Sequence, residues 1–301
     1  MIRAMTSPVR GVAFVLVLWV IAMLSILLGS FALIARTENL QSRHLFDTTQ
    51  ARYAAEAGLN LAVFELRKPD ATLRWVADGR PYQFGYGDAD VEVSITDDSG
   101  KIDINTADGD LLTSLFMGRG VPIDQATALA DAIQDWRDPD DLAHPNGAEA
   151  PEYKAAGLPY TPKNAPFDTV SELQQVLGMT YDLYEKIEPG LTIYSGRNAP
   201  NAAFANKIAL QAMYPDAAPE QIDQLIQQLQ SQAPGVPAQG ILAPDGTPVM
   251  AGGGGLTYSV KSRAKLPNGA STVLDATIRM GGINAAGRPY VILRWRDGET
   301  S

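Results

Sequence analysis

The residues with the clearest chemical potential form an acidic stretch near the middle of the chain. Clustered carboxylates need a cation to lie close together, and a ligand set made of oxygen atoms alone selects a hard ion, calcium before magnesium in an exposed, flexible loop. The stretch is therefore a candidate calcium site. Its candidate ligands are Asp138, Asp140, Asp141, Asn146 and Glu149, with Asp135 and Glu152 as weaker candidates.

The spacing does not reproduce a standard calcium loop. With Asp138 as position one, Asp140 stands at position three and Glu149 at position twelve, as in an EF-hand. However, Leu142 occupies position five and Ala143 replaces the glycine that the loop requires. The alternative interpretation is a solvated acidic turn that ends a helix, with its carboxylates free in water.

Composition excludes several other chemistries. The chain has no cysteine, so thiol catalysis, disulfides and cysteine-ligated zinc are ruled out. Its two histidines, His44 and His144, are one hundred positions apart and neither lies in a nucleophile motif, so we expect no enzyme. The net charge of −10 and the pI near 4.7 disfavour nucleic-acid binding.

The element that organises the chain is an apolar stretch, Val12 to Ala35, without an ionisable side chain. It is long enough to cross a bilayer as a helix. Arg3 and Arg10 precede it, so the positive-inside rule predicts a cytoplasmic amino terminus and an extracytoplasmic remainder. Apolar residues continue at helical spacing beyond Arg36, which predicts one helix over residues 12–67, with residues 12–35 in the membrane.

A short basic leader that ends in glycine before such a helix resembles the type IV pilin-like proteins. The resemblance implies cleavage by prepilin peptidase between Gly11 and Val12, with methylation of the new terminus. Most pilins carry glutamate at the fifth mature position, where this chain has Leu16. That glutamate is thought to attract the amine of a preceding subunit, which the first subunit of a filament lacks. A plain single-pass anchor is the alternative.

Strand patterns on both sides of a long helical region predict an interrupted domain. Residues 82–86 and 91–95 alternate with period two, and the pattern resumes over residues 258–266, 272–280 and 290–295. We therefore expect an α+β, type IV pilin-like fold, with the long helix packed on an antiparallel sheet. Its β domain comprises residues 68–100 and 256–301, and residues 101–255 form an inserted α-helical domain.

The insertion carries two hairpin-like patterns, one around Gly118-Arg119-Gly120 and one over residues 167–180. They resemble the helix-hairpin-helix or SAM-like family, whose hairpin amides grip DNA phosphates. A membrane-anchored DNA-binding or DNA-uptake protein is therefore the rival function. Acidic residues outnumber the basic ones here, so we expect repulsion of DNA. The proline- and glycine-rich stretch 233–255 is predicted to be a mobile loop.

The order of these elements is similar to that of the K subunits of type II secretion systems. The resemblance implies a minor pseudopilin that initiates and caps the pseudopilus tip and supports export of folded proteins across the outer membrane. It also implies calcium in the helical domain and association with the I and J minor pseudopilins, with the H subunit as a further candidate. The expected location is the inner membrane, with the carboxy-terminal part in the periplasm.

Overall fold

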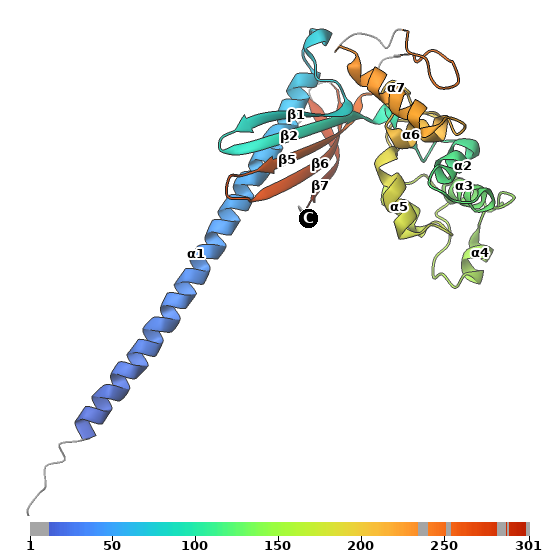
Figure 1. Cartoon of the computed structure of the whole chain (residues 1–301). Helices are drawn as coiled ribbons and strands as arrows, with labels where there is room; N and C mark the ends of the chain where they lie inside the picture. The colour runs from blue at the N-terminus through green and yellow to red at the C-terminus, as the bar shows by residue number, and fades with distance from the viewer. Residues whose placement is uncertain (1–11, 234–239, 251–253, 282–286, 288, 299–301) are drawn as a thin grey trace, which may run out of the picture.

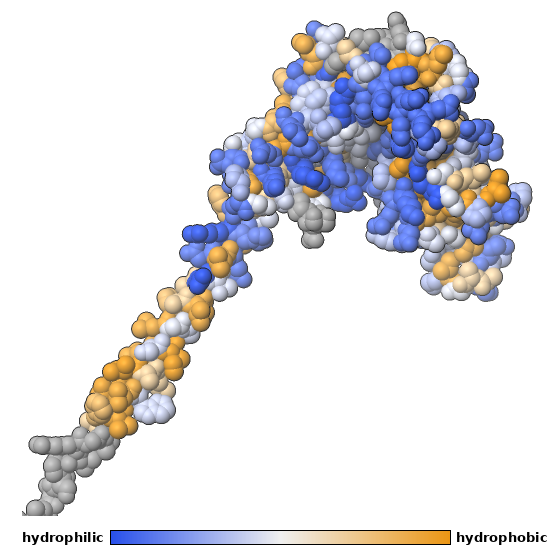
Figure 2. Space-filling view, viewed as in Figure 1, coloured by the Kyte–Doolittle hydropathy of each residue, from blue (hydrophilic) through white to orange (hydrophobic). Residues whose placement is uncertain are grey.

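The fold is built around one long helix. The computed structural model describes residues 12–233, 240–250, 254–281, 287 and 289–298. Helix α1 (Val12–Leu66) runs out from the rest of the molecule as a single rod (Figure 1). Its first half is apolar and exposed, and Figure 2 shows this half as a hydrophobic surface. Within the described residues, α1 is the one helix long and apolar enough to span a membrane.

The second half of α1 packs on an antiparallel sheet of order β1-β2-β5-β6-β7. Small helix residues, among them Ala51, Ala55 and Gly58, bring the helix close to the sheet. A Cβ atom on Gly58 would lie 2.9 Å from Cγ2 of Val93 and would overlap the hydroxyl of Ser262. The strands are β1 (Asp78–Tyr86), β2 (Ala89–Asp97), β5 (Thr257–Lys265), β6 (Ser271–Met280) and β7 (Tyr290–Gly298).

The helical insertion lies between β2 and β5, which are neighbours in the sheet. Asp97 at the end of β2 pairs with Tyr258 near the start of β5, so the chain leaves and re-enters the sheet at one place. The insertion has its own hydrophobic core, separate from the core between α1 and the sheet. Its elements are η2 (Asp98–Gly100), β3 (Ile102–Asp103), α2 (Gly109–Met117), α3 (Ile123–Arg137), α4 (Ala150–Ala155), η3 (Val170–Gln175), α5 (Tyr181–Ile187), η4 (Glu188–Gly190), β4 (Leu191–Thr192), α6 (Lys207–Met213) and α7 (Pro219–Ser231).

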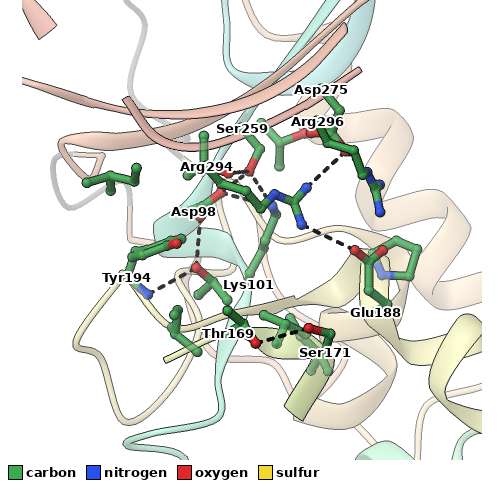
Figure 3. Close-up of a pocket in the computed structure, with 18 of the residues that line it drawn as sticks. Asp98, Lys101, Thr169, Ser171, Glu188, Tyr194, Ser259, Asp275, Arg294 and Arg296 are labelled. Atoms are coloured by element: carbon green, nitrogen blue, oxygen red, sulfur yellow. Dashed lines mark hydrogen bonds and ion pairs between the residues drawn. The ribbon is translucent and has the colours of Figure 1, made fainter. Parts of the chain in front are cut away.

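Buried carboxylates fix the insertion to the sheet. Asp98 accepts hydrogen bonds from Ser259 of β5 at 2.7 Å and from Thr192 of β4 at 2.8 Å, and it pairs with Lys101 at 2.9 Å (Figure 3). Asp97 accepts a hydrogen bond from the amide of Gly255 at 2.8 Å, where the chain returns to the sheet. Polar groups buried at such a junction are satisfied by one another, which joins the two domains at a defined position.

The predicted architecture is confirmed: a long helix packs on an antiparallel sheet that a helical domain interrupts. Two strand bounds differ from the alternating stretches: β1 begins at Asp78 instead of residue 82, and β2 begins at Ala89 instead of residue 91. The fold also buries Asp97, Asp98, Asp103 and Asp135, so these carboxylates contribute less to the expected repulsion of DNA than their number in the sequence suggests.

The predicted mobile loop is also partly wrong. Residues 234–239 and 251–253 lie outside the described part of the chain. Between them, Ile241, Ala243 and Val249 are buried in the core of the insertion, and Leu242 and Pro248 form a β-bridge. The three apolar side chains anchor this segment despite its proline and glycine content, because their burial stabilises an ordered turn.

Candidate functional site

The predicted acidic site lies between two helices of the insertion. Helix α3 ends at Arg137, and Asp138 is extended because Pro139 disfavours a helical conformation in the residue before it. Arg137 turns back to donate hydrogen bonds to the carbonyl oxygens of Ile104 and Ala107, which fixes this end. The loop returns at Glu149, the N-cap of α4. Both ends of the acidic stretch therefore belong to packed helices.

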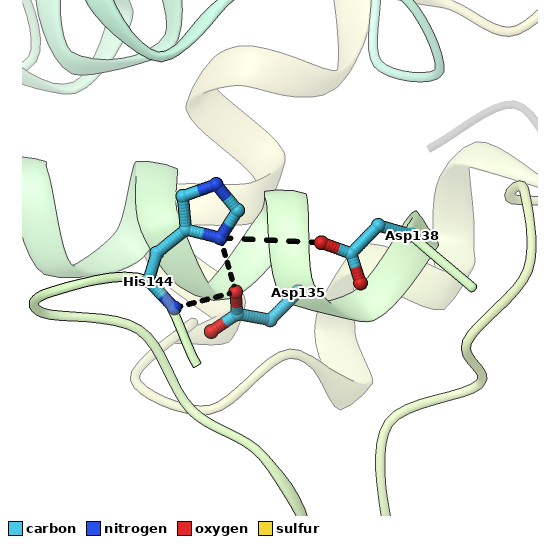
Figure 4. A group of neighbouring side chains, drawn as sticks. All are labelled: Asp135, Asp138 and His144. Carbon is cyan, nitrogen blue, oxygen red and sulfur yellow. Dashed lines mark hydrogen bonds and ion pairs between the residues drawn. The ribbon is translucent and has the colours of Figure 1, made fainter. Parts of the chain in front are cut away.

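Asp135, near the end of α3, holds the acidic loop in place through hydrogen bonds. Its side chain is fully buried and receives the backbone amides of His144 at 3.0 Å and Ala148 at 2.6 Å. The imidazole Nδ1 atom of His144 lies 2.5 Å from the Oδ1 atom of Asp135, and 4.0 Å from Oδ2 of Asp138 (Figure 4). A Cβ atom at Gly147 would overlap the Asp135 carboxylate, so this position needs glycine.

The pKa of Glu149 reflects its burial and the negative charges around it. Its side chain is 3% exposed, and burial raises its pKa to about 7, with further contributions from the charges of Asp135, Asp138, Asp141 and Asp140. Burial also raises the pKa of Asp138, helped by Asp140 and Asp135. The fold has thus gathered these carboxylates closely enough for each charge to disfavour the next.

Three oxygen atoms in this region are buried and have no hydrogen-bond donor within the described part of the chain: Oδ1 of Asp138, Oε1 of Glu149 and Oδ1 of Asn164. Asn164 has a left-handed backbone, with φ of 51°, and its Nδ2 atom donates to the Asp140 carbonyl at 3.0 Å and to Asp141 Oδ1 at 2.8 Å. Buried polar atoms are rarely left without a partner. Acceptor oxygens without donors, set among carboxylates, fit the ligand chemistry of a calcium ion.

The structure separates the predicted ligands into two groups. Asp138, Asp140, Asp141 and Glu149 share one electrostatic neighbourhood. Asn146 instead donates its backbone and side-chain amides to Asp131, at 3.0 and 3.2 Å. The Glu152 carboxylate accepts the Glu149 amide at 2.9 Å in a capping box. Asn146 and Glu152 therefore have structural partners, and Asp135 acts as the support of the loop.

Two residues of the site were missed by sequence reasoning. His144 was noted in the acidic loop but given no role, and with Asp135 and Asp138 it forms a group whose ligand atoms lie within 4.8 Å of one another. Its pKa is raised, chiefly by the hydrogen bond to Asp135. Asn164 is distant in sequence and carries no motif. The one general indication in the sequence is that asparagine adopts a positive φ more readily than most residues do.

In the hairpin around Gly118-Arg119-Gly120, four consecutive amides donate within the insertion. The backbone N–H groups of Gly118, Arg119, Gly120 and Val121 all donate to carbonyl oxygens of residues 114–117. The Arg119 guanidinium donates to Gln211 at 2.9 Å, and burial lowers its pKa. These four amides and the Nη2 group of Arg119 are thus already used within the insertion.

Comparison with known proteins gives a consistent result. Residues 93–196 match the family described as type II secretion system (T2SS), protein K. A type II secretion system protein K from Klebsiella pneumoniae is 28% identical over 201 residues, which cover 60% of this chain and 61% of that protein. A protein K from Pectobacterium carotovorum subsp. carotovorum is 36% identical over 75 residues, or 25% of this chain and 23% of that protein. The chain thus spans less than two thirds of the length of these relatives.

A solved structure extends the fold comparison over most of the chain. It is the GspK-GspI-GspJ complex from the enterotoxigenic Escherichia coli type 2 secretion system. The superposition has a TM-score of 0.59 and 20% sequence identity, and it covers 88% of this chain and 99% of the solved one.

A long apolar helix, a sheet packed on its second half and a helical domain inserted between two neighbouring strands define a pilin-like fold whose helix is long and apolar enough to span a membrane. Within that class, the chain is similar to the protein K family of type II secretion systems, whose family model matches residues 93–196. The resemblance predicted from the sequence is confirmed.

Proposed function

We propose that the chain acts as a minor pseudopilin of a type II secretion system, where it starts and caps the tip of the pseudopilus. The observation that carries the proposal is the position of the insertion. It lies at the end of the molecule remote from the free part of α1 (Figure 1), beyond the sheet. A domain of this size at that end would block the addition of a further subunit above it.

The amino-terminal segment supports a role as the first subunit. Gly11, the proposed cleavage point, lies outside the described residues, and Val12 begins α1. Leu16 is 61% exposed on the free part of the helix. A leucine there is compatible with lipid without a partner amine, as a subunit without a predecessor requires.

The partners we propose are the I and J minor pseudopilins, with H as a further candidate. The exposed side chains of α1 include Phe14, Trp19 and Phe31, and such a surface suits packing in a membrane bundle. The proposed location is the inner membrane, with the sheet and insertion in the periplasm. Prepilin peptidase would process the leader.

We further propose that calcium stiffens the acidic loop of the insertion. Asp138, Asp140, Asp141 and Glu149 would hold the ion, together with Asn164, whose side-chain oxygen has no donor. Calcium would supply positive charge among carboxylates that otherwise repel one another, and it would tie the end of α3 to the start of α4. Asp135 and His144 would keep the loop in position through their hydrogen bond.

The test is assembly in a membrane. The full chain would be expressed with a prepilin peptidase and tagged I and J subunits, then solubilised and isolated through the tag. The proposal expects a chain that begins at Val12 and co-purifies with both partners. A chain that keeps residues 1–11 and purifies alone would contradict it, and salt-sensitive binding to duplex DNA would favour the rival function.

A further inference from the structure

The insertion and the sheet are joined at one place and separated beside it by a cleft. The cleft has a volume of about 590 Å³ and lies on the face of the sheet that does not contact α1 (Figure 3). At the junction, Asp98 and Lys101 of the insertion both reach Ser259 of β5, at 2.7 and 2.6 Å. The chain enters and leaves the insertion here, between β2 and β5. The junction is therefore the natural pivot for a rotation of one domain against the other.

The insertion is also contacted from each edge strand of the sheet. On β7, Nη1 of Arg294 lies 3.4 Å from the carboxylate of Glu188 in η4 (Figure 3). On β1, Nη2 of Arg80 donates to the carbonyl oxygen of Gln230 in α7 at 2.9 Å. We call these two interactions the edge contacts. Since β2 and β5 lie between β1 and β7 in the sheet, the edge contacts hold the insertion on both sides of the junction.

The two arginines of the edge contacts are anchored in the same way. Each forms an ion pair with a carboxylate of the sheet, Arg294 with Asp275 at 2.9 Å and Arg80 with Asp78 at 2.6 Å. A guanidinium group has five N–H donors in a fixed plane, so it can hold two acceptors at once. The sheet carboxylate thus fixes the position of the arginine, and the remaining donors reach the insertion.

The strand register places the β7 contact at a distance from the junction. Ser259 pairs with Thr277 of β6, and Thr277 pairs with Arg294 of β7. Neighbouring strands are about 4.8 Å apart, so Arg294 lies on the same row about 10 Å from the junction. A contact at this distance resists rotation about the junction. The adjoining cleft is space into which the insertion can move when the contact is broken.

We propose that the edge contacts fix the angle between the insertion and the sheet, and that the insertion rocks about the junction when Arg294 and Glu188 separate. Their distance of 3.4 Å exceeds the roughly 2.7–2.9 Å of a strong charge-assisted hydrogen bond. Both side chains are partly exposed, and ion pairs of this kind are weak. The contact is therefore readily broken, and its loss changes the direction of the insertion relative to α1. This inference goes beyond the proposed function and does not rest on it.

The competing explanation is that the buried carboxylates of the junction fix the angle by themselves, and that the edge contacts are incidental surface interactions. The two explanations differ in one measurable respect. If the junction suffices, the distance between a point on the sheet and a point on the insertion is unchanged when an edge contact is removed.

The experiment measures this distance by pulsed electron spin resonance on the full chain in detergent micelles. Because the chain has no cysteine, Asp88→Cys and Asp124→Cys introduce two unique sites for spin labels. Both positions are exposed, the first between β1 and β2 and the second on α3. We expect a narrow distance distribution in this parent, and one at least about twofold wider after Glu188→Gln or Arg294→Gln. Unchanged distributions in both variants would overturn the proposal.

A matched variant and salt separate the edge contact from a general effect of charge. Arg263→Gln removes the same charge from an exposed position on β5 that does not line the cleft, and should leave the distribution unchanged. Salt at about 0.5 M screens exposed ion pairs, so it should widen the parent distribution more than that of Glu188→Gln. Circular dichroism would establish that each variant is folded. Equal widening by Arg263→Gln and Arg294→Gln, or an equal salt effect with and without Glu188, would contradict the proposal.

The contact on β1 is tested in the same way. Arg80→Gln removes the donor to the Gln230 carbonyl, and combined with Arg294→Gln it should widen the distribution more than either change alone. A double variant no wider than Arg294→Gln would contradict the role of the β1 contact.

Discussion

The Nδ1 atom of His144 lies 2.5 Å from the Oδ1 atom of Asp135, and the same carboxylate also receives the backbone amides of His144 and Ala148. One buried side chain therefore holds the whole acidic loop against helix α3. This contact places the side chains that we propose to bind calcium. Asp135 itself holds the loop and is not one of the proposed ligands.

Asp135→Asn should loosen the loop. An amide has one acceptor oxygen instead of two and presents its NH₂ group to a backbone donor, which leaves buried groups unsatisfied. We expect a loss of about 2 kcal/mol of stability, measured by chemical unfolding in a chelator. Asp124→Asn, at an exposed position early in the same helix, is the control and should cost less than about 1 kcal/mol. Equal losses in the two variants would contradict the supporting role of Asp135.

Calcium should raise the Tm of the wild-type chain. At a free concentration one hundred times its Kd, a ligand bound only to the folded state adds about 2.7 kcal/mol. Glu149→Gln and Asp138→Asn should reduce the shift strongly, whereas Asp124→Asn should retain it. A calcium titration that leaves the Tm unmoved would contradict the proposed site, and the same titration with magnesium tests the choice of ion.

Without calcium, stability should fall as the pH rises from about 5 to 8. The folded chain holds the Glu149 proton up to a pKa of about 7, whereas the unfolded chain releases it near 4.5, so ionisation penalises the folded state across this window. The raised pKa values of Asp138 and Asp97 act in the same direction. The raised pKa of His144 also makes stability fall as the pH rises. Its imidazolium charge stabilises the folded state, and this charge is lost when the pH passes the pKa of His144 in the folded chain.

Glu149→Gln isolates the largest part of this pH dependence. In a chelator, the variant should be more stable than the wild type at pH 8, by up to about 3 kcal/mol, and should have a flatter profile between pH 5 and 8. Unfolding by urea at several pH values measures both effects. A variant as pH-dependent as the wild type would rule out Glu149 as the main cause.

Gly58→Ala should destabilise the contact between α1 and the sheet. The new methyl group would meet Val93 and the buried Ser262, so the helix would have to move away, at a cost of about 1–3 kcal/mol. Gly29→Ala, on the same helix with no neighbour within 4 Å, is the control. Thermal unfolding followed by circular dichroism should detect the loss in the first variant and none in the second.

Leu16→Glu tests the start of the filament. A carboxylate at this position would lie at membrane depth without a preceding subunit to neutralise it, so we expect less co-purification with the I and J subunits. Leu18→Gln, another substitution in the same exposed helix segment, controls for added polarity. Unchanged assembly of Leu16→Glu would contradict the role of this position.

Much of the architecture follows from local patterns. The apolar stretch after Gly11 determines a membrane-length helix, because its length and lack of charge admit few other structures. Period-two alternation predicts the strands, and their separation in sequence predicts the insertion. The acidic stretch after Asp135 indicates the candidate site for the same reason, since its members are close along the chain.

Tertiary structure alone decided which polar residues are buried and what they contact. Sequence patterns cannot distinguish Asp98, Asp103 and Asp135, which are buried at junctions, from Asp140, which is exposed. The partners of these residues are set by packing between segments far apart in the chain, as Asn164 is brought to Asp141 and Ser259 to Asp98. The same packing placed the ion pairs of Arg294 and Arg296 on one face of β7 and an apolar groove on the other. Local propensity determined the elements, and long-range burial determined the sites that they form.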